Sequence, residues 1–245
     1  MKNLTLAVAV LGVALTSFAD AAVKNVVLVH GAFADGSGWM PVASILEHDG
    51  YSVFVVQEPL TGFEADVAAT RIVLDRSGPC VLVGHSWAGM IITEAGTHAS
   101  VRSLVYINAF QPTVGETAGA LQNKTPPAAQ SVGPVGGGFL GVRPEAFEQD
   151  FAADVPKPVA HFMSISQVPI AASSFDATVK ATAWSQKPSY AVVSTGDRMI
   201  NPELERFMSR RAKSETIELT GSHAIFLSHP KEVAALIEKV AAAAQ

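Results

Sequence analysis

Short runs of β-branched and other apolar residues alternate along the chain with longer segments in which apolar residues recur at helical spacing. Continuous apolar runs predict strands that are buried on both faces, and their alternation with helices predicts a parallel sheet covered by helices. The runs lie at residues 25–31, 51–57, 80–84, 101–108, 189–195 and 215–220. We therefore expect an α/β fold with a mostly parallel sheet of about six strands flanked by helices.

The segments between these runs predict the helices. Their bounds are 39–48, 63–75, 87–97, 202–213 and 229–244. Two of them carry a start signal, because Asn201 precedes Pro202 and His229 precedes Pro230, and proline favours the first helical position.

One connection is much longer than a crossover needs. About 80 residues separate the fourth strand from the fifth, whereas typical connections have a few residues besides their helix. We expect a cap insertion at residues 111–186, between two parts of one core at 22–110 and 187–245. Its first half is rich in proline and glycine, with a loop at 136–138, and helical pieces are expected at 145–152 and 173–184.

The first 21 residues have the pattern of a secretory signal peptide. Lys2 precedes an apolar stretch of about 15 residues, and Ala19-Asp20-Ala21 offers small residues at a cleavage site. The stretch is shorter than the ~20 residues that span a bilayer. We expect cleavage after Ala21, a periplasmic or secreted mature chain, and no membrane span in that chain.

Composition narrows the classes of partner. The 245 residues are 49% hydrophobic and 16% charged, enough for one core with an elaboration. A formal charge of −5 without a basic run argues against a nucleic-acid partner. The single cysteine, Cys80, is expected to be a buried thiol, and no metal-ligand cluster or phosphate loop stands out, so neither a metal nor a cofactor is expected. The sequence does not indicate an oligomeric state.

Polar residues follow three of the predicted strands. In a parallel sheet a ligand lies beyond the carboxyl ends of the strands, and Ser86, Asp197 and His223 fall there in that order. A serine hydroxyl needs a base within hydrogen-bond reach, and the base needs an acid that orients it. We predict Ser86 as nucleophile, His223 as base and Asp197 as acid. The alternative for Asp197 is a carboxylate that only caps turn N–H groups.

The stretch around Ser86 departs from the usual frame. A nucleophile on a strand-to-helix bend usually lies in Gly-x-Ser-x-Gly, whereas this chain has Gly84 before the serine but Ala88 two residues after it, with Gly89 next. The alternative is a serine that only caps the following helix.

Four motifs together resemble the α/β-hydrolase superfamily. They are "VLVHGAFADGSGW", "VLVGHSWAG", "TGDRMINP" and "GSHAIFLSHP", and they look most like the small capped branch that holds plant methyl esterases, hydroxynitrile lyases and bacterial pyrethroid-hydrolase-type carboxylesterases. The resemblance implies a serine esterase that forms an acyl-enzyme, with an oxyanion hole made by the backbone N–H groups of Ala32 and Trp87. Some members carry the acid after the preceding strand, but Asn108 occupies that position here.

The resemblance also implies a small-molecule ester substrate, and the aromatic residues of the expected cap indicate an apolar pocket for a small to medium hydrophobic acyl or alcohol group. The alternative for these aromatic residues is that they only pack the cap onto the core. The residues expected to line or support the pocket are Phe33, Trp39, Phe139, Phe147, Phe151, His161 and Phe162. Two alternatives stay open. Hydroxynitrile lyases of this branch carry a lysine directly after the histidine, where this chain has Ala224, and a protein of this fold can instead bind a ligand for signalling.

Overall fold

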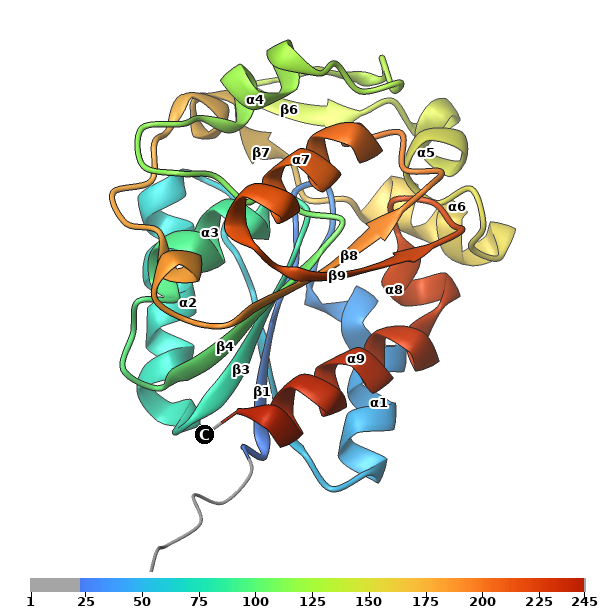
Figure 1. The fold of residues 1–245 in the computed structure, drawn as a ribbon. Coiled ribbons are helices and arrows are strands. Elements are labelled where there is room, and N and C mark those ends of the chain that lie inside the picture. The colour runs from blue at the N-terminus through green and yellow to red at the C-terminus, as the bar shows by residue number, and fades with distance from the viewer. Residues whose placement is uncertain (1–22, 245) are drawn as a thin grey trace, which may run out of the picture.

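A sheet of six parallel strands forms the centre of the protein (Figure 1). The computed structural model describes residues 23–244, so the predicted signal peptide lies outside the described residues. The strand order is β2-β1-β3-β4-β8-β9. The bounds are Asn25–Val29 (β1), Ser52–Val56 (β2), Cys80–His85 (β3), Val101–Ile107 (β4), Ser189–Ser194 (β8) and Glu215–Leu219 (β9). Each predicted run forms one strand, which confirms the α/β fold.

The direction of strand addition changes at β1. Val29 lies opposite Val56 of β2 on one side and opposite Gly84 of β3 on the other. Such a switch point opens a crevice beyond the carboxyl ends of the strands. The segments that leave β1 and β3 therefore start side by side. Cys80, at the start of β3, is buried as expected.

Helices cover both faces of the sheet. In Figure 1, α1 and α9 lie together on one face, and α2 and α3 lie together on the other. The bounds are Met40–His48 (α1, after the 3-10 helix Gly36–Trp39), Phe63–Ser77 (α2), Ala88–Ala95 (α3), Pro202–Ala212 (α7), Ile225–Ser228 (α8) and Pro230–Ala243 (α9). The Asn201 side chain caps α7 by accepting the Glu203 N–H at 3.0 Å, as its position predicts, whereas the His229 side chain makes no such bond before Pro230.

The long connection between β4 and β8 folds into a layer at the top of Figure 1. It contains α4 (Ala118–Lys124), β5 (Val132–Gly136), β6 (Phe139–Val142), α5 (Pro144–Phe151), α6 (Lys157–Ser166) and β7 (Ile170–Ala171). The strands of this segment form an antiparallel sheet that sequence patterning did not predict, because β5 consists largely of glycine and proline. Gly136, Gly137 and Gly138 form its tight turn, with φ of 102°, 59° and 80°. The predicted helical piece at 145–152 corresponds to α5.

The predicted helical piece at 173–184 is wrong. The chain there forms two short 3-10 helices, Ala172–Asp176 and Ala183–Ser185, with extended chain between them. The backbone N–H groups of Lys180 and Ala181 donate to the carboxylate of Glu94 in α3, at 2.6 and 3.1 Å. These N–H groups therefore bond to the core instead of to a helical turn.

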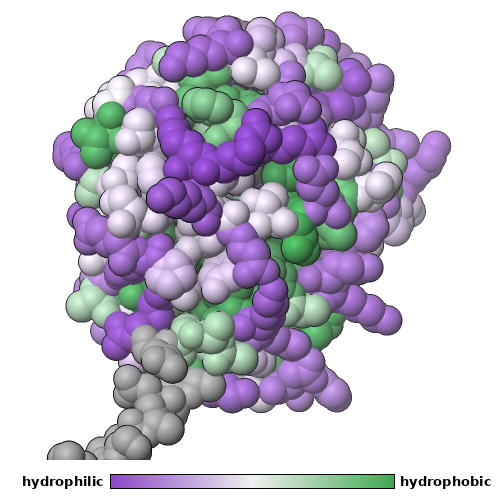
Figure 2. All heavy atoms as spheres, in the orientation of Figure 1, coloured by the Kyte–Doolittle hydropathy of each residue, from purple (hydrophilic) through white to green (hydrophobic). Residues whose placement is uncertain are grey.

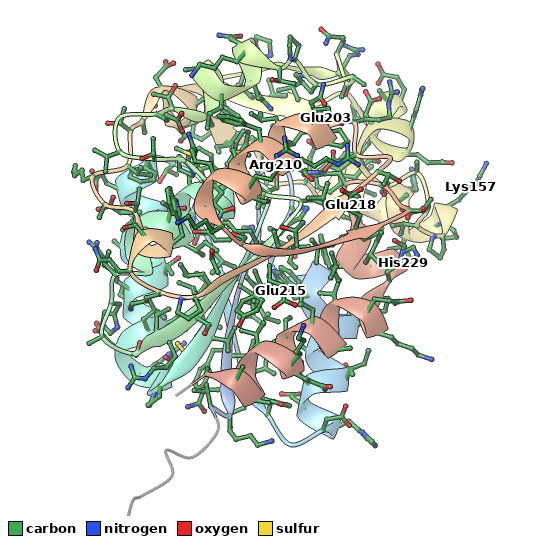
Figure 3. The ribbon with its side chains drawn as sticks, in the orientation of Figure 1. Lys157, Glu203, Arg210, Glu215, Glu218 and His229 are labelled. Carbon is green, nitrogen blue, oxygen red and sulfur yellow. The ribbon has the colours of Figure 1, made fainter. Side chains whose placement is uncertain are left out.

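One face of the molecule is mainly polar, and ion pairs link α7 to β9. The face drawn in Figure 2 is mostly hydrophilic or intermediate, with hydrophobic patches between. Glu203 on α7 and Glu218 on β9, both labelled in Figure 3, accept hydrogen bonds of 2.6 to 2.8 Å from Arg206. These bonds tie α7 to the edge strand. No helix formed within residues 23–244 is long and apolar enough to cross a membrane.

Candidate active site

Ser86 occupies the bend between β3 and α3. Its backbone has a φ of 56°, a left-handed conformation that a residue with a side chain rarely adopts and that costs free energy. The bend is held by the Ser86 N–H, which donates to the Ile107 carbonyl at 3.2 Å, and by the Ser86 carbonyl, which accepts the Phe110 N–H at 3.2 Å. No side chain caps α3, so the alternative, in which Ser86 only caps this helix, is wrong.

The departure from the usual glycine frame has a steric explanation. A Cβ added to Gly89 would lie 1.9 Å from the Phe110 carbonyl oxygen, far inside van der Waals contact. A Cβ added to Gly84 would lie 3.0 Å from the Ala88 carbonyl oxygen. The helix therefore approaches the loop after β4 most closely at Gly89, three residues after Ser86.

The structure brings Ser86, His223 and Asp197 together in one hydrogen-bonded chain. His223 Nε2 lies 2.8 Å from Ser86 Oγ, and His223 Nδ1 lies 2.6 Å from Asp197 Oδ2. All three side chains are buried. Because a carboxylate only accepts, Nδ1 carries the imidazole proton and Nε2 is left to accept the serine proton. These are the groups that nucleophilic acyl transfer requires.

Asp197 is fixed by its own loop. Its Oδ1 accepts the backbone N–H groups of Met199 and Ile200 at 2.7 and 3.0 Å, while Oδ2 faces the histidine. The carboxylate thus caps the turn, which was the alternative for this residue, and holds the imidazole at the same time. The two functions use different oxygens of one carboxylate.

Asn108 is a site residue whose function sequence reasoning missed. Its Nδ2 donates to Ser194 Oγ and to the carbonyl oxygens of Ser222 and His223, at 2.8, 3.1 and 3.1 Å, and its Oδ1 accepts the Ser194 N–H at 2.9 Å. The buried amide therefore ties the end of β4 to β8 and to the loop that carries His223. Its position at a strand end was the available signal, but its bonding partners lie far along the sequence.

The two predicted oxyanion donors flank Ser86. Ala32 and Trp87 line the same cavity as Ser86, and both are buried. Within residues 23–244, neither backbone N–H donates a hydrogen bond. Two unpaired N–H groups beside a serine hydroxyl have the arrangement needed to bind a developing oxyanion.

The cavity beside Ser86 has a volume of about 420 Å³ and is walled by both the core and the segment between β4 and β8. Of the residues expected in its wall, Phe33 lines it, together with Ala32 and Trp87. Its other apolar walls come from residues that the sequence did not predict, among them Phe110, Leu140, Phe175, Met199 and Ile200. Gln122, Asn123 and Gln130 add polar groups.

Six expected pocket residues do not line this cavity, and their assignment as lining residues is corrected, although the Phe151 ring packs 4.8 Å from the His223 ring. Trp39 is fully buried against Phe226, with ring centroids 4.6 Å apart. Phe147 and Phe151 are buried and stack on each other at 4.8 Å. Phe139 lies on β6, but its neighbour Leu140 is the one that faces the cavity, since adjacent strand residues point to opposite sides.

The last two of these six residues are on α6. Phe162 is 63% exposed and lines a separate apolar groove of about 380 Å³ between α6 and the start of α1. His161 is exposed beside it and lines neither cavity. The face of a helix that meets a cavity depends on how the helix packs, which the sequence of the segment did not reveal.

Comparisons with known proteins identify the family of this chain. Residues 26–236 match the profile of the Alpha/beta hydrolase family. This chain belongs to the alpha/beta hydrolase family. A carbendazim hydrolyzing esterase from Nocardioides sp. (strain SG-4G) is 31% identical over 128 residues, which cover 46% of this chain and 53% of the relative. The chain thus matches about half the length of that curated relative.

Solved structures share the fold. A pyrethroid hydrolase from Sphingobium faniae JZ-2 has a TM-score of 0.76 at 23% identity, over 89% of this chain and 97% of that one. Polyneuridine aldehyde esterase has a TM-score of 0.78 at 17% identity, over 89% and 98% of the two chains. The match of residues 26–236 to the family profile confirms the family that the sequence motifs suggested.

In this alpha/beta hydrolase, two further histidines brace the site. His85 Nε2 donates to the His223 carbonyl at 3.0 Å, and the two rings lie 4.5 Å apart. Burial, followed by the nearby charge of His223, lowers the pKa of His85 well below its usual value, which keeps this ring neutral. His30 joins the loop after β1 to Glu58, whose N–H it accepts at 2.9 Å.

A buried carboxyl lies behind Asp197. Glu205, on the inner face of α7, is 2% exposed, and neither of its oxygens has a hydrogen-bond donor among the described residues. Burial, followed by the negative charge of Asp197, raises the pKa of Glu205 well above its usual value. The shift favours the protonated form of Glu205, which adds no second negative charge beside Asp197. Within residues 23–244, no group of three or more metal-binding side chains is close enough to hold a metal ion.

Proposed function

We propose that this alpha/beta hydrolase is a serine carboxylesterase that cleaves small to medium hydrophobic esters. The observation that carries the proposal is the continuous chain from Ser86 Oγ through His223 to Asp197, at 2.8 and 2.6 Å, at the wall of a cavity. The names of the esterase relatives support the same reaction class.

The proposed reaction has two halves. Ser86 Oγ attacks the ester carbonyl carbon while its proton passes to His223 Nε2, and the carbonyl oxygen becomes an oxyanion that accepts the N–H groups of Ala32 and Trp87. The C–O bond to the alcohol then breaks, and His223 returns the proton to the leaving oxygen. In the second half, water loses a proton to His223 and attacks the acyl-serine, which releases the acid and restores Ser86. Asp197 holds His223 in the tautomer that both halves need.

The cavity supports the substrate class. Its volume of about 420 Å³ lies toward the low end of the 300–1,000 Å³ typical of small-molecule sites. Aromatic and aliphatic side chains form most of its wall, so an apolar acyl or alcohol group would leave water on binding there.

Labelling and turnover test the proposal. A fluorophosphonate probe should label Ser86 in the purified mature chain, and p-nitrophenyl acetate and butyrate should be hydrolysed. Ser86→Ala should lose labelling and lower kcat by on the order of 10⁴- to 10⁶-fold, because the nucleophile cannot be replaced. Ser185→Ala, at an exposed serine, serves as the matched control. Binding of the esters without Ser86-dependent turnover would identify a binding protein instead.

We also propose that the mature chain is periplasmic or secreted after removal of residues 1–21. This proposal rests on the charge, apolar stretch and small residues of the N-terminal sequence alone.

A further inference from the structure

The segment 57–66, which runs from the end of β2 into the first turn of α2, contacts both backbone segments that carry the proposed oxyanion donors. On the Ala32 side, Gln57 Oε1 accepts the Gly36 N–H at 3.1 Å, and the Glu58 N–H donates to His30 Nε2 at 2.9 Å. On the Ser86 side, the indole Nε1–H of Trp87 donates to Asp66 Oδ2 at 3.0 Å. One short segment therefore touches the chain before Ala32, the loop after it, and the side chain of Trp87.

Asp66 is the link on the Ser86 side, and its side chain is fully buried. While Oδ2 accepts the indole N–H, Oδ1 accepts the backbone N–H of Leu60 at 2.8 Å. Leu60 is itself fixed, since its φ of 55° is left-handed and its carbonyl accepts the N–H of Ala171 in β7 at 2.8 Å. The carboxylate thus joins Trp87 to a constrained point of the segment.

A second carboxyl completes the cluster. Glu58 Oε1 accepts the Thr70 hydroxyl at 2.7 Å, and its buried Oε2 has no hydrogen-bond partner among the described residues. Burial, followed by the charge of Asp66, raises the pKa of Glu58 well above its usual value. Burial also raises the pKa of Asp66, while the N–H groups of Trp87 and Leu60 that it accepts lower it. With its proton on Glu58, the pair leaves both oxygens of Asp66 free to accept N–H groups.

Trp87 is the residue through which this cluster reaches the reaction. Its ring packs edge-on to Phe63 of α2 and lies 5.7 Å from Phe175, while its backbone N–H is one of the proposed donors. A donor is effective only when it lies about 3 Å from the oxyanion, and an error of about 1 Å can cost about 100-fold in rate. The hydrogen bond of the indole to Asp66 thus fixes the Trp87 side chain on the segment 57–66, and through the side chain it restrains the position of the Trp87 backbone N–H.

We infer that Asp66 is a positioning residue, which sets the spacing of the Ala32 and Trp87 N–H groups by holding the Trp87 indole on the segment that also braces the Ala32 loop. This inference rests on the proposed function. It assigns Asp66 no contact with substrate, so its effect is expected on the transition state and not on ground-state binding.

The test compares Asp66→Asn, Trp87→Phe and the double variant. The Asp66→Asn substitution leaves one acceptor oxygen for two N–H groups, so the pair of bonds to Leu60 and to the indole cannot both persist. Trp87→Phe keeps an aromatic ring and removes the five-membered ring that carries the N–H. Each single variant should lower kcat for p-nitrophenyl butyrate by about 10- to 100-fold with KM within about threefold. The double variant should be no worse than the less active single variant, because both substitutions remove the same bond.

Two readouts separate positioning from general damage. The inhibition constant of a trifluoromethyl ketone, whose adduct with serine carries an oxyanion, should rise by the same factor as kcat falls. The indole N–H resonance of Trp87 should shift upfield in Asp66→Asn, because it loses a carboxylate acceptor. Asp75→Asn, at an exposed residue of the same helix, is the matched control and should change neither readout.

Each outcome decides the inference. A kcat within twofold of wild type in Asp66→Asn overturns it, as does an unchanged ketone inhibition constant or a fully additive double variant. If Asp66→Asn does not fold, Trp87→Phe alone decides the inference: a fall in kcat with little change in KM supports it, and an unchanged kcat overturns it. Absence of Ser86-dependent turnover in the wild type overturns both proposals, whereas turnover that Asp66→Asn leaves intact overturns only this one.

Discussion

Gly89→Ala is the sharpest test of how the bend at Ser86 is built. Glycine in a helix is less stable than alanine by about 0.5 to 1 kcal/mol, so on propensity alone the substitution should stabilise α3. Here the added Cβ would lie 1.9 Å from the Phe110 carbonyl oxygen and 2.8 Å from its carbonyl carbon and nitrogen. A normal contact needs more than about 3 Å, so helix and loop must separate by about 1 Å or more.

The steric effect should win. Overpacking a close-packed site costs about 1 to 3 kcal/mol and sometimes more, which exceeds the gain in propensity. The same separation stretches the 3.2 Å bond from the Phe110 N–H to the Ser86 carbonyl and so moves Ser86 relative to His223. We expect a net loss of about 1 to 2 kcal/mol in the free energy of unfolding and a fall in kcat/KM of about 100-fold.

Urea unfolding and hydrolysis of p-nitrophenyl butyrate measure the two effects. Gly133→Ala, in β5, is the matched control, because an added Cβ there meets nothing within 4 Å. It should keep both stability and activity. A Gly89→Ala variant as stable as wild type, or more stable, would refute the reasoning, since propensity would then outweigh the contact with Phe110.

Two further predictions concern titration and processing. The pKa of Glu205 is raised in the folded protein above its usual value of 4.5. The stability that this residue contributes is therefore complete below pH 4.5 and is lost as pH rises toward the folded pKa, by about 1.4 kcal/mol per pH unit. In urea unfolding, wild type should therefore lose stability between pH 5 and pH 8, and Glu205→Gln should lose less. Parallel pH profiles of the two free energies of unfolding would contradict this. For export, the full-length chain produced in a Gram-negative host should yield a mature N-terminus at Ala22 by N-terminal sequencing, and an intact Met1 would contradict the proposed signal peptide.

The strands and the order of the site residues were predictable because they depend on local patterns. A continuous β-branched run is buried on both faces wherever it lies in the sheet, so residues 80–84 predict a central strand without further context. The carboxyl ends of parallel strands meet at one edge of the sheet. This rule predicts that Ser86 and His223 lie close together although they are 137 positions apart in the chain. The resemblance to the hydrolase family rests on the same strand ends.

The wall of the cavity was not predictable in this way. Leu140 faces it and Phe139 does not, and a shift of one residue in strand register would reverse them. Trp39 and Phe151 have the large aromatic side chains that are typical of apolar pockets, but both are fully buried by packing against other side chains. Composition therefore indicated an apolar pocket but could not assign its members.

The sequence by itself determined the sheet, the family and the strand ends at which Ser86, Asp197 and His223 lie, since these follow from short patterns and one topological rule. Only the tertiary structure decided what positions them. Asn108 forms hydrogen bonds with residues that lie 86 to 115 positions further along the chain. Asp66, in α2, bonds to Trp87, which follows β3. Such bonds depend on distances and side-chain directions that arise when the elements pack, and no local pattern in the chain encodes them.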